Sequence, residues 1–170
     1  MLYNITRDKS SKDQLIVPES FMKGTAISKK SHINLKVAGR IAKIELIKSK
    51  ELENKQILLS ENIFDQLMIP EDIPYQILAE KDYLRIGPVI GLLMTSTKSR
   101  MSKSTLAKLM SYTLIYPEIG GLLVAFSTDC INLEEKTVQG YYYDSNFKGR
   151  GLPCIAGTFP LPEVIFSRTI

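Results

Sequence analysis

The feature that most constrains the fold is an almost wholly apolar run over residues 87–94, which opens onto a tract rich in Ser, Thr, Lys and Arg. Such a run is typical of a central strand that is covered on both faces. A helical pattern follows, with Ser104 as its expected cap. Its apolar residues recur at spacings of three and four positions, which is the pattern of one buried helix face: Leu106, Leu109, Met110 and Leu114.

A second buried strand is predicted directly after this helix. Pro117 and the pair Gly120-Gly121 end the helix, and the apolar segment LLVAFS follows them. A strand, a helix and a strand joined by short loops form a βαβ unit, so we expect the two strands to be parallel neighbours with a right-handed crossover. Further strands are expected at VQGYYY and within PLPEVIFSR.

The first half of the chain predicts a small closed or half-closed β-barrel. One short helix is expected between Ser60 and Pro70. The fold class is therefore α/β, with a small β-barrel-like region over residues 1–82 and an α/β region over residues 83–170. No linker separates the two regions, so we expect them to share one core. The strands of the barrel are predicted from short alternating runs near residues 14–17, 24–27, 33–37, 41–49, 56–59 and 75–79.

Charge and cysteine content exclude several classes of protein. Basic residues exceed acidic ones by 22 to 18, for a net charge of +4, and nucleic-acid binders usually carry a denser basic stripe. Nucleic acid is therefore not an expected partner. The N-terminus has no apolar segment of signal-peptide length, and no apolar run approaches the roughly 18 residues of a membrane span. With only Cys130 and Cys154 and no CxxC motif, we expect a cytoplasmic protein with no membrane contact.

The sequence offers no catalytic or metal-binding constellation. His32 is the single histidine, and it lies within a strand pattern. Zinc sites need clustered His and Cys, and phosphate loops need a glycine motif such as GxxxxGK[ST], which does not occur here. We assign no catalytic residue, no metal ligand and no cofactor to this chain, which is not expected to be an enzyme by itself.

The polar tract after the apolar run is the candidate binding site. It lies at the carboxyl end of a buried strand, where open α/β sheets usually bind ligands, and beside a helix N-terminus, which favours anions. Its hydroxyls and cations suit a phosphate or a carboxylate, although a solvated connecting loop has the same composition. The candidate substrate-binding residues in this tract are Thr95, Ser96, Lys98, Arg100, Lys103 and Ser104.

Another candidate cation follows the last expected strand. Pro160 and Pro162 favour an extended backbone, and Arg168 comes after the apolar residues, where its guanidinium suits a carboxylate or phosphate. The alternative is an edge strand with a salt-bridged end. In the glycine-containing loop before this strand, Lys148 and Arg150 either reach a ligand or face water.

Three segments and the helix between the first two resemble the N-terminal half of the YheC/YheD family, which are spore-coat-associated proteins with an ATP-grasp domain. The segments are IGPVIGLLMTS, GGLLVAFSTDCINLEEKTVQGYYY and PLPEVIFSR, and the resemblance covers residues 57–168 and fades in the first fifty. It implies a barrel-like region, then a pre-ATP-grasp (Rossmann-like) α/β layer, then an ATP-grasp domain. This chain departs from the family because it has no tryptophan, and because Glu163 and Phe166 replace the usual Asp and Tyr.

The resemblance implies that this chain is the N-terminal, non-catalytic portion of such a ligase-like protein, or a truncated relative. It would help to bind a small anionic acceptor, an amino acid or a peptide, through the candidate residues. It would dock on a downstream ATP-grasp domain that binds ATP and Mg²⁺, and docking of this kind predicts an exposed apolar patch with Val164, Ile165 and Phe166. The alternative is a spore-associated adaptor that binds coat proteins and has no enzymatic activity.

Overall fold

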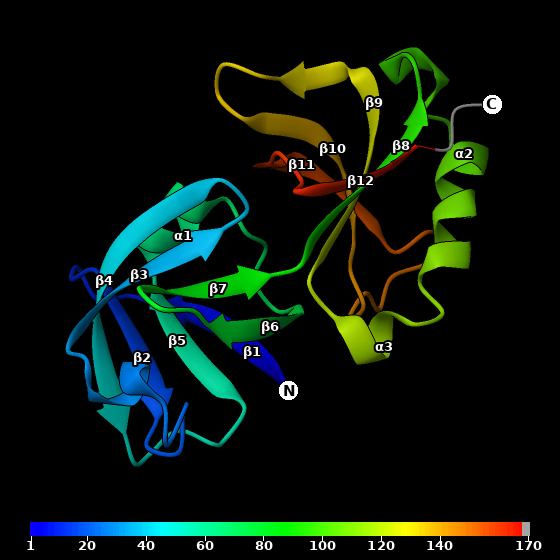
Figure 1. The fold of residues 1–170 in the computed structure, drawn as a ribbon. Helices are drawn as coiled ribbons and strands as arrows, with labels where there is room; N and C mark the ends of the chain where they lie inside the picture. The colour runs from blue at the N-terminus through cyan, green and yellow to red at the C-terminus, as the bar shows by residue number, and fades with distance from the viewer. Residues whose placement is uncertain (168–170) are drawn as a thin grey trace.

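The computed structural model describes residues 1–167, and these form a closed seven-stranded barrel followed by a five-stranded sheet (Figure 1). The protein is mostly β with few, short helices, so the α/β class expected from the sequence is corrected. The barrel expected in the first half of the chain is confirmed.

The barrel closes in the strand order β1-β5-β2-β4-β3-β7-β6. Closure leaves no free strand edge, and alternate residues of each strand fill the interior. A turn and the 3-10 helix η1 (Ala26–Lys29) replace the strand expected near residues 24–27. The helix α1 (Glu61–Leu67) packs against the barrel and buries three apolar side chains. The barrel strands are β1 (Leu2–Asp8), β2 (Gln14–Pro18), β3 (His32–Val37), β4 (Arg40–Ser49), β5 (Gln56–Ser60), β6 (Pro74–Ala79) and β7 (Tyr83–Gly87).

The five-stranded sheet is mixed and has the order β11-β10-β9-β8-β12. Strand β8 pairs in parallel with β9 and β12, while the pairs β9–β10 and β10–β11 are antiparallel. The parallel pairing of β8 and β9, expected from the βαβ pattern, is confirmed. The strands of this sheet are β8 (Val89–Thr95), β9 (Leu122–Asn132), β10 (Thr137–Tyr143), β11 (Cys154–Pro160) and β12 (Val164–Ser167).

The apolar run over residues 87–94 begins at the last residue of β7 and continues as β8. β7 pairs with β3 and β6 in the barrel, and β8 starts the second sheet after Pro88. Proline has no amide hydrogen to donate to a strand ladder, which suits a position between two sheets. The chain therefore passes from barrel to sheet at residues 87–88, whereas the division into domains at residue 82 stays a prediction.

The helical segment between β8 and β9 is broken into short pieces: α2 (Lys103–Ala107), η3 (Lys108–Tyr112) and α3 (Tyr116–Ile119). Leu106 and Leu109 are buried as expected, but Leu114 is 84% exposed and does not belong to the buried face. Ser102 caps α2, because its side chain accepts the Thr105 N–H at 3.2 Å, and the expected cap Ser104 lies inside the helix. The Rossmann-like layer expected from the family resemblance is therefore not confirmed.

The two faces of the second sheet have different neighbours. One face carries Val124, Phe126, Val138 and Phe159, which belong to the same apolar cluster as the barrel interior. The other face packs under α2, η3 and α3 through a separate cluster that includes Leu92, Leu123 and Ala125. The shared core expected from the missing linker is confirmed.

Polar contacts also fasten the sheet to the barrel. The Gly121 N–H donates to the Pro74 carbonyl at 2.6 Å, and the Gln76 side-chain amide donates to the Ile119 carbonyl at 2.7 Å. Arg85 of β7 forms an ion pair at 2.8 Å with Glu163, which immediately precedes β12. The first two contacts hold the segment before β9 against the barrel, and the ion pair holds the segment before β12.

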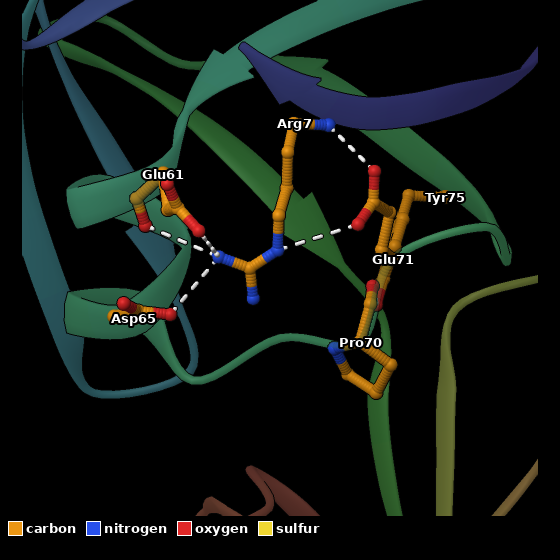
Figure 2. A network of polar contacts seen from close by, with 6 residues as sticks. All are labelled: Arg7, Glu61, Asp65, Pro70, Glu71 and Tyr75. Atoms are coloured by element: carbon orange, nitrogen blue, oxygen red, sulfur yellow. Dashed lines mark hydrogen bonds and ion pairs between the residues drawn. The ribbon is translucent and has the colours of Figure 1, made fainter. Parts of the chain in front are cut away.

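Arg7 organises the outer wall of the barrel beside α1 (Figure 2). Its guanidinium forms ion pairs with Asp65 at 3.0 Å and with Glu71 at 3.3 Å, and it lies 4.9 Å from the centre of the Phe64 ring. The backbone N–H of Arg7 also donates to Glu71 at 2.7 Å. The network joins β1, α1 and the loop before β6, so the carboxylates of Asp65 and Glu71 have a structural role.

Candidate groove on the helix-covered face of the sheet

The loop after β8 is folded back on itself by its own polar groups. The Thr95 hydroxyl donates to the Thr97 carbonyl at 2.9 Å, and the Thr97 and Ser99 hydroxyls share a hydrogen bond of 3.1 Å. A single turn of 3-10 helix, η2 (Lys98–Arg100), follows. Several hydroxyls that the sequence offered to a ligand are therefore already partnered within the loop.

A carboxylate of the chain itself lies against this loop. Asp129 of β9 accepts the backbone N–H of Lys98 through both oxygens, at 2.9 and 3.0 Å, and the Ser127 hydroxyl donates to it at 2.6 Å. The Ser127 hydroxyl and the Lys98 N–H lower the pKa of Asp129, so it is ionised at neutral pH. This backbone donor is thus already paired with an anion.

Two adjoining pockets form a single groove on the face of the sheet that α2 partly covers. The larger pocket has a volume of about 710 Å³ and the smaller one about 240 Å³, and both are lined by Met101 and Tyr141. We call the two together the groove. Its charged and polar lining residues are Lys98, Lys103, Ser104, Ser127, Cys130, Gln139, Tyr141, Arg150, Cys154 and Thr158.

The floor of the groove follows from the alternation of side chains along two paired strands. Gln139 and Tyr141 are two residues apart on β10, and they pair in register with Thr158 and Ala156 on β11. Cys154 lies one further step along the same face of β11, since alternate residues of a strand share a face. The floor is therefore a continuous strip of β-sheet.

The wall and one end of the groove bring cations together from distant parts of the chain. Lys103 and Ser104 from α2 line the larger pocket opposite Arg150, which lies in the loop between β10 and β11. Lys98 lines the smaller pocket. No carboxylate lines either pocket among the residues that the structure describes.

The candidate residues predicted from the sequence are only partly gathered here. Lys98, Lys103 and Ser104 line the groove, whereas Thr95, Ser96 and Arg100 do not. Arg168 lies outside the described residues. Whether any of these residues binds a substrate stays a prediction.

Sequence reasoning missed the floor of the groove and left Arg150 undecided. Gln139 and Tyr141 alternate in the segment VQGYYY, and Ala156 and Thr158 alternate in the segment CIAGTF. The two-residue alternation was the available signal, but the sequence does not show which strand lies beside which.

Neither a metal site nor a membrane-spanning helix occurs among residues 1–167. No three His, Cys, Asp or Glu side chains gather there as metal ligands. His32 is exposed, and its ring shares a hydrogen bond of 3.2 Å with Ser31. The described helices are too short or too polar to cross a membrane.

The predicted apolar patch at the end of the chain is exposed as expected. Val164, Ile165 and Phe166 are 50%, 44% and 54% exposed on β12, which is an edge strand of the sheet. Phe166 also lines an apolar pocket of about 240 Å³ with Ile90 and Ile115, among others. Phe166 therefore continues onto β12 the apolar surface that the other residues of this pocket form.

The fold and the groove define a class of protein: a barrel that carries a mixed sheet with an open, cation-lined groove on one face. Comparison with known proteins gives a relative. The chain is 25% identical over 164 residues to the endospore coat-associated protein YheD of Bacillus subtilis (strain 168), a match that spans 95% of this chain and 33% of YheD. The chain thus spans about a third of the length of that relative, and the match covers its N-terminal part.

The resemblance to the N-terminal part of the YheC/YheD proteins is therefore confirmed. It reaches further than expected, because a match over 95% of the chain includes most of the first fifty residues, where the sequence motifs faded. No family model matches the chain, and no solved structure matches it significantly.

Proposed function

We propose that this chain is the acceptor-binding, non-catalytic portion of a YheD-like protein, and that it holds a small anionic acceptor in the groove. One observation carries the proposal: Lys103 and Arg150, from distant parts of the sequence, line one pocket with the Ser104 hydroxyl and without a carboxylate. Two unneutralised cations beside a hydroxyl favour a carboxylate or a phosphate.

The proposed reaction context comes from the family resemblance. ATP-grasp proteins resemble carboxylate–amine ligases, in which ATP activates a carboxylate for attack by an amine. In this proposal a second region of the protein binds ATP and Mg²⁺, and the sheet described above is the pre-ATP-grasp layer that positions the acceptor. The contribution of this chain is to bind and orient the acceptor, since none of its described groups fits a metal ion.

The apolar surface at β12 is the proposed docking face for that second region. Large contiguous apolar surfaces are uncommon on isolated soluble proteins and mark interaction sites. Here the exposed Val164 and Phe166 lie on the helix-covered face of β12, because they pair in register with Ile90 and Leu92. About two thirds of YheD lie outside the part that is similar to this chain, and the proposed docked region corresponds to those two thirds.

Anion binding in the groove is tested by adding sodium acetate and N-acetylalanine to the isotopically labelled 170-residue chain and recording amide resonances by NMR. We expect saturable shifts within residues 98–107 and 150–158. The double variant Lys103→Gln/Arg150→Gln should weaken binding at least tenfold, because a charge-assisted hydrogen bond contributes about 1.5–3 kcal/mol.

Lys148→Gln is the matched control for this test. Lys148 lies in the same loop as Arg150 and carries the same charge, but it does not line the groove. Equal weakening of anion binding in Lys148→Gln would show that the change in net charge alone causes the loss of affinity. The absence of any saturable shift would overturn the proposed function.

The second candidate function is a spore-associated adaptor that binds coat proteins without enzymatic activity. The exposed apolar strand β12 favours it, as does the name of the relative, an endospore coat-associated protein. Fusing a fluorescent protein to the chain in a sporulating cell discriminates between the two functions. Recruitment to the coat that is lost in Phe166→Ser and retained in Lys103→Gln/Arg150→Gln supports the adaptor.

A further inference from the structure

The groove also indicates which kind of anion it takes. Resting on the function proposed above, we infer that the acceptor is a peptide of about three or four residues, bound in an extended conformation along β10 and β11. Its terminal carboxylate lies at the end formed by Lys103 and Arg150, and its backbone runs toward Thr158.

The length of the floor excludes a single amino acid as a ligand that fills the groove. Cys154, Ala156 and Thr158 lie on the same face of β11, and together they span four residue steps. At about 3.3 Å per residue, the floor is roughly 13 Å long. An extended peptide has the same rise per residue, so three or four residues cover this distance and one does not.

The charges of the groove give the peptide a direction. Lys103 and Arg150 lie at the end nearest Cys154, and no described carboxylate lines that pocket. At the other end only one cation, Lys98, lines the groove. Two cations therefore lie at one end and one at the other, and a single terminal carboxylate binds most favourably at the end with two.

The middle of the groove suits the neutral backbone of a peptide. The side chains of Gln139, Tyr141 and Thr158 form no hydrogen bond within the described residues and line the groove. Amide and hydroxyl groups both donate and accept hydrogen bonds, which matches the alternating N–H and C=O groups of a peptide. A compact anion such as inorganic phosphate would leave these three side chains unused.

The remaining lining residues provide room and apolar contact for side chains of the peptide. Ala156 contributes only a methyl group to the middle of the floor, and Met101 lines the same pocket. Methionine adapts to ligands of different shape because its side chain is unbranched and flexible. The groove therefore accepts small or medium apolar side chains without a pocket for one particular residue.

The experiment compares three synthetic probes with the 170-residue chain by NMR titration: N-acetylalanine, N-acetyl-trialanine and N-acetyl-trialanine amide. The first two differ in length and carry the same single charge, and the third lacks the charge. We expect the tripeptide acid to bind about tenfold tighter than N-acetylalanine, as two additional hydrogen bonds of about 0.5–1.5 kcal/mol each predict. The amide should bind about tenfold more weakly than the acid.

Two variants assign the ends of the peptide. Arg150→Gln should reduce the preference for the acid over the amide to about twofold. Gln139→Ala/Thr158→Val should bring the ratio of the tripeptide and N-acetylalanine dissociation constants close to one. Lys148→Gln is the control for both, and dispersed amide resonances in each variant show that it has folded.

The outcomes separate this inference from the proposed function. If N-acetylalanine binds and the tripeptide binds no tighter, the inference is overturned and the anion site stands. If the amide binds as tightly as the acid, the assigned direction is wrong and the inference is likewise overturned. If none of the acidic probes binds, the proposed function itself is overturned.

Discussion

At the scale of single residues, the sheet depends on glycines that leave space for aromatic rings. A Cβ atom at Gly91 of β8 would lie 2.7 Å from the Phe126 ring and 2.8 Å from Pro162. Both contacts are shorter than van der Waals separations, and their partners are packed in the core. Gly91 therefore permits β8 to lie between the ring of β9 and the segment that leads into β12.

Gly91→Val should destabilise the protein by about 1–3 kcal/mol, the usual cost of overpacking a core. The free energy of unfolding from urea titration checks this value. Gly39→Ala is the control, since Gly39 lies at the β3–β4 turn, where an added Cβ meets nothing within 4 Å. Equal stability of Gly91→Val and the native protein would contradict the packing argument.

The burial of a residue is predicted more reliably where the apolar residues follow a local spacing pattern. Leu106 and Leu109 were assigned to a core face by their spacing, and both are buried. Leu114 fits the same spacing and is exposed, because the segment around it turns away from the helix axis before α3. The close approach of Phe126 to Gly91 joins two strands and has no signature in the local sequence.

At the scale of elements, an ion pair with the barrel anchors the residue that precedes β12, in addition to the pairing of β12 with β8. Arg85 pairs with Glu80 at 2.6 Å and with Glu163 at 2.8 Å, and the guanidinium hydrogen bond lowers the pKa of Glu80. The side chain of Arg85 is 29% exposed and that of Glu163 is 36% exposed, so the pair is partly shielded from water. The start of β12 is thus anchored to the barrel.

Glu163→Gln should increase amide hydrogen exchange in β12 by up to about fivefold and lower the free energy of unfolding by at most about 1 kcal/mol. Hydrogen exchange read by NMR measures the local effect. Glu19→Gln removes an exposed ion pair of 3.9 Å with Lys50 and should change neither quantity. An unchanged exchange rate in β12 would show that strand pairing alone holds it.

Elements were predicted well when their partners were neighbours in the sequence. The parallel pairing of β8 and β9 followed from the βαβ pattern, and a barrel followed from the many short strands of the first half. The assignment of β7 and β8 to different sheets was missed, since the two strands follow each other with only Pro88 between them. Only their different partners, β3 and β6 against β9 and β12, distinguish them.

The candidate site was predicted in part for the same reason. Lys98 and Lys103 belong to one local loop after a buried strand, which the sequence shows directly. Arg150 and Thr158 reach the groove only because β10 and β11 form a hairpin beside β9. Tertiary contacts of this kind are not encoded in a local pattern.

At the scale of the whole molecule, the barrel and the sheet share one apolar core. Val124 and Phe126 of β9 belong to the same buried cluster as Ile5 and Leu35 of the barrel. Separating the two parts would expose this surface to water at a cost of about 25 cal/mol for each Å² of apolar area. The two parts are therefore expected to be one cooperative unit.

Unfolding in urea should accordingly be a single transition. NMR peak intensities of β3 in the barrel and of β9 in the sheet should fall with the same midpoint and the same slope. Midpoints that differ between the two strands would show that the barrel unfolds independently of the sheet.

The hairpin β10–β11 has a consequence for how proteins of this kind diversify. Its strands are held in register by seven consecutive residue pairs, and the loop between them, residues 144–153, carries Arg150. Because surface loops tolerate insertions and deletions at little thermodynamic cost, this loop can change in length while the strip of sheet below it stays the same. Natural selection can thus move or replace the cation above a constant floor, and one scaffold can acquire new ligand preferences without refolding.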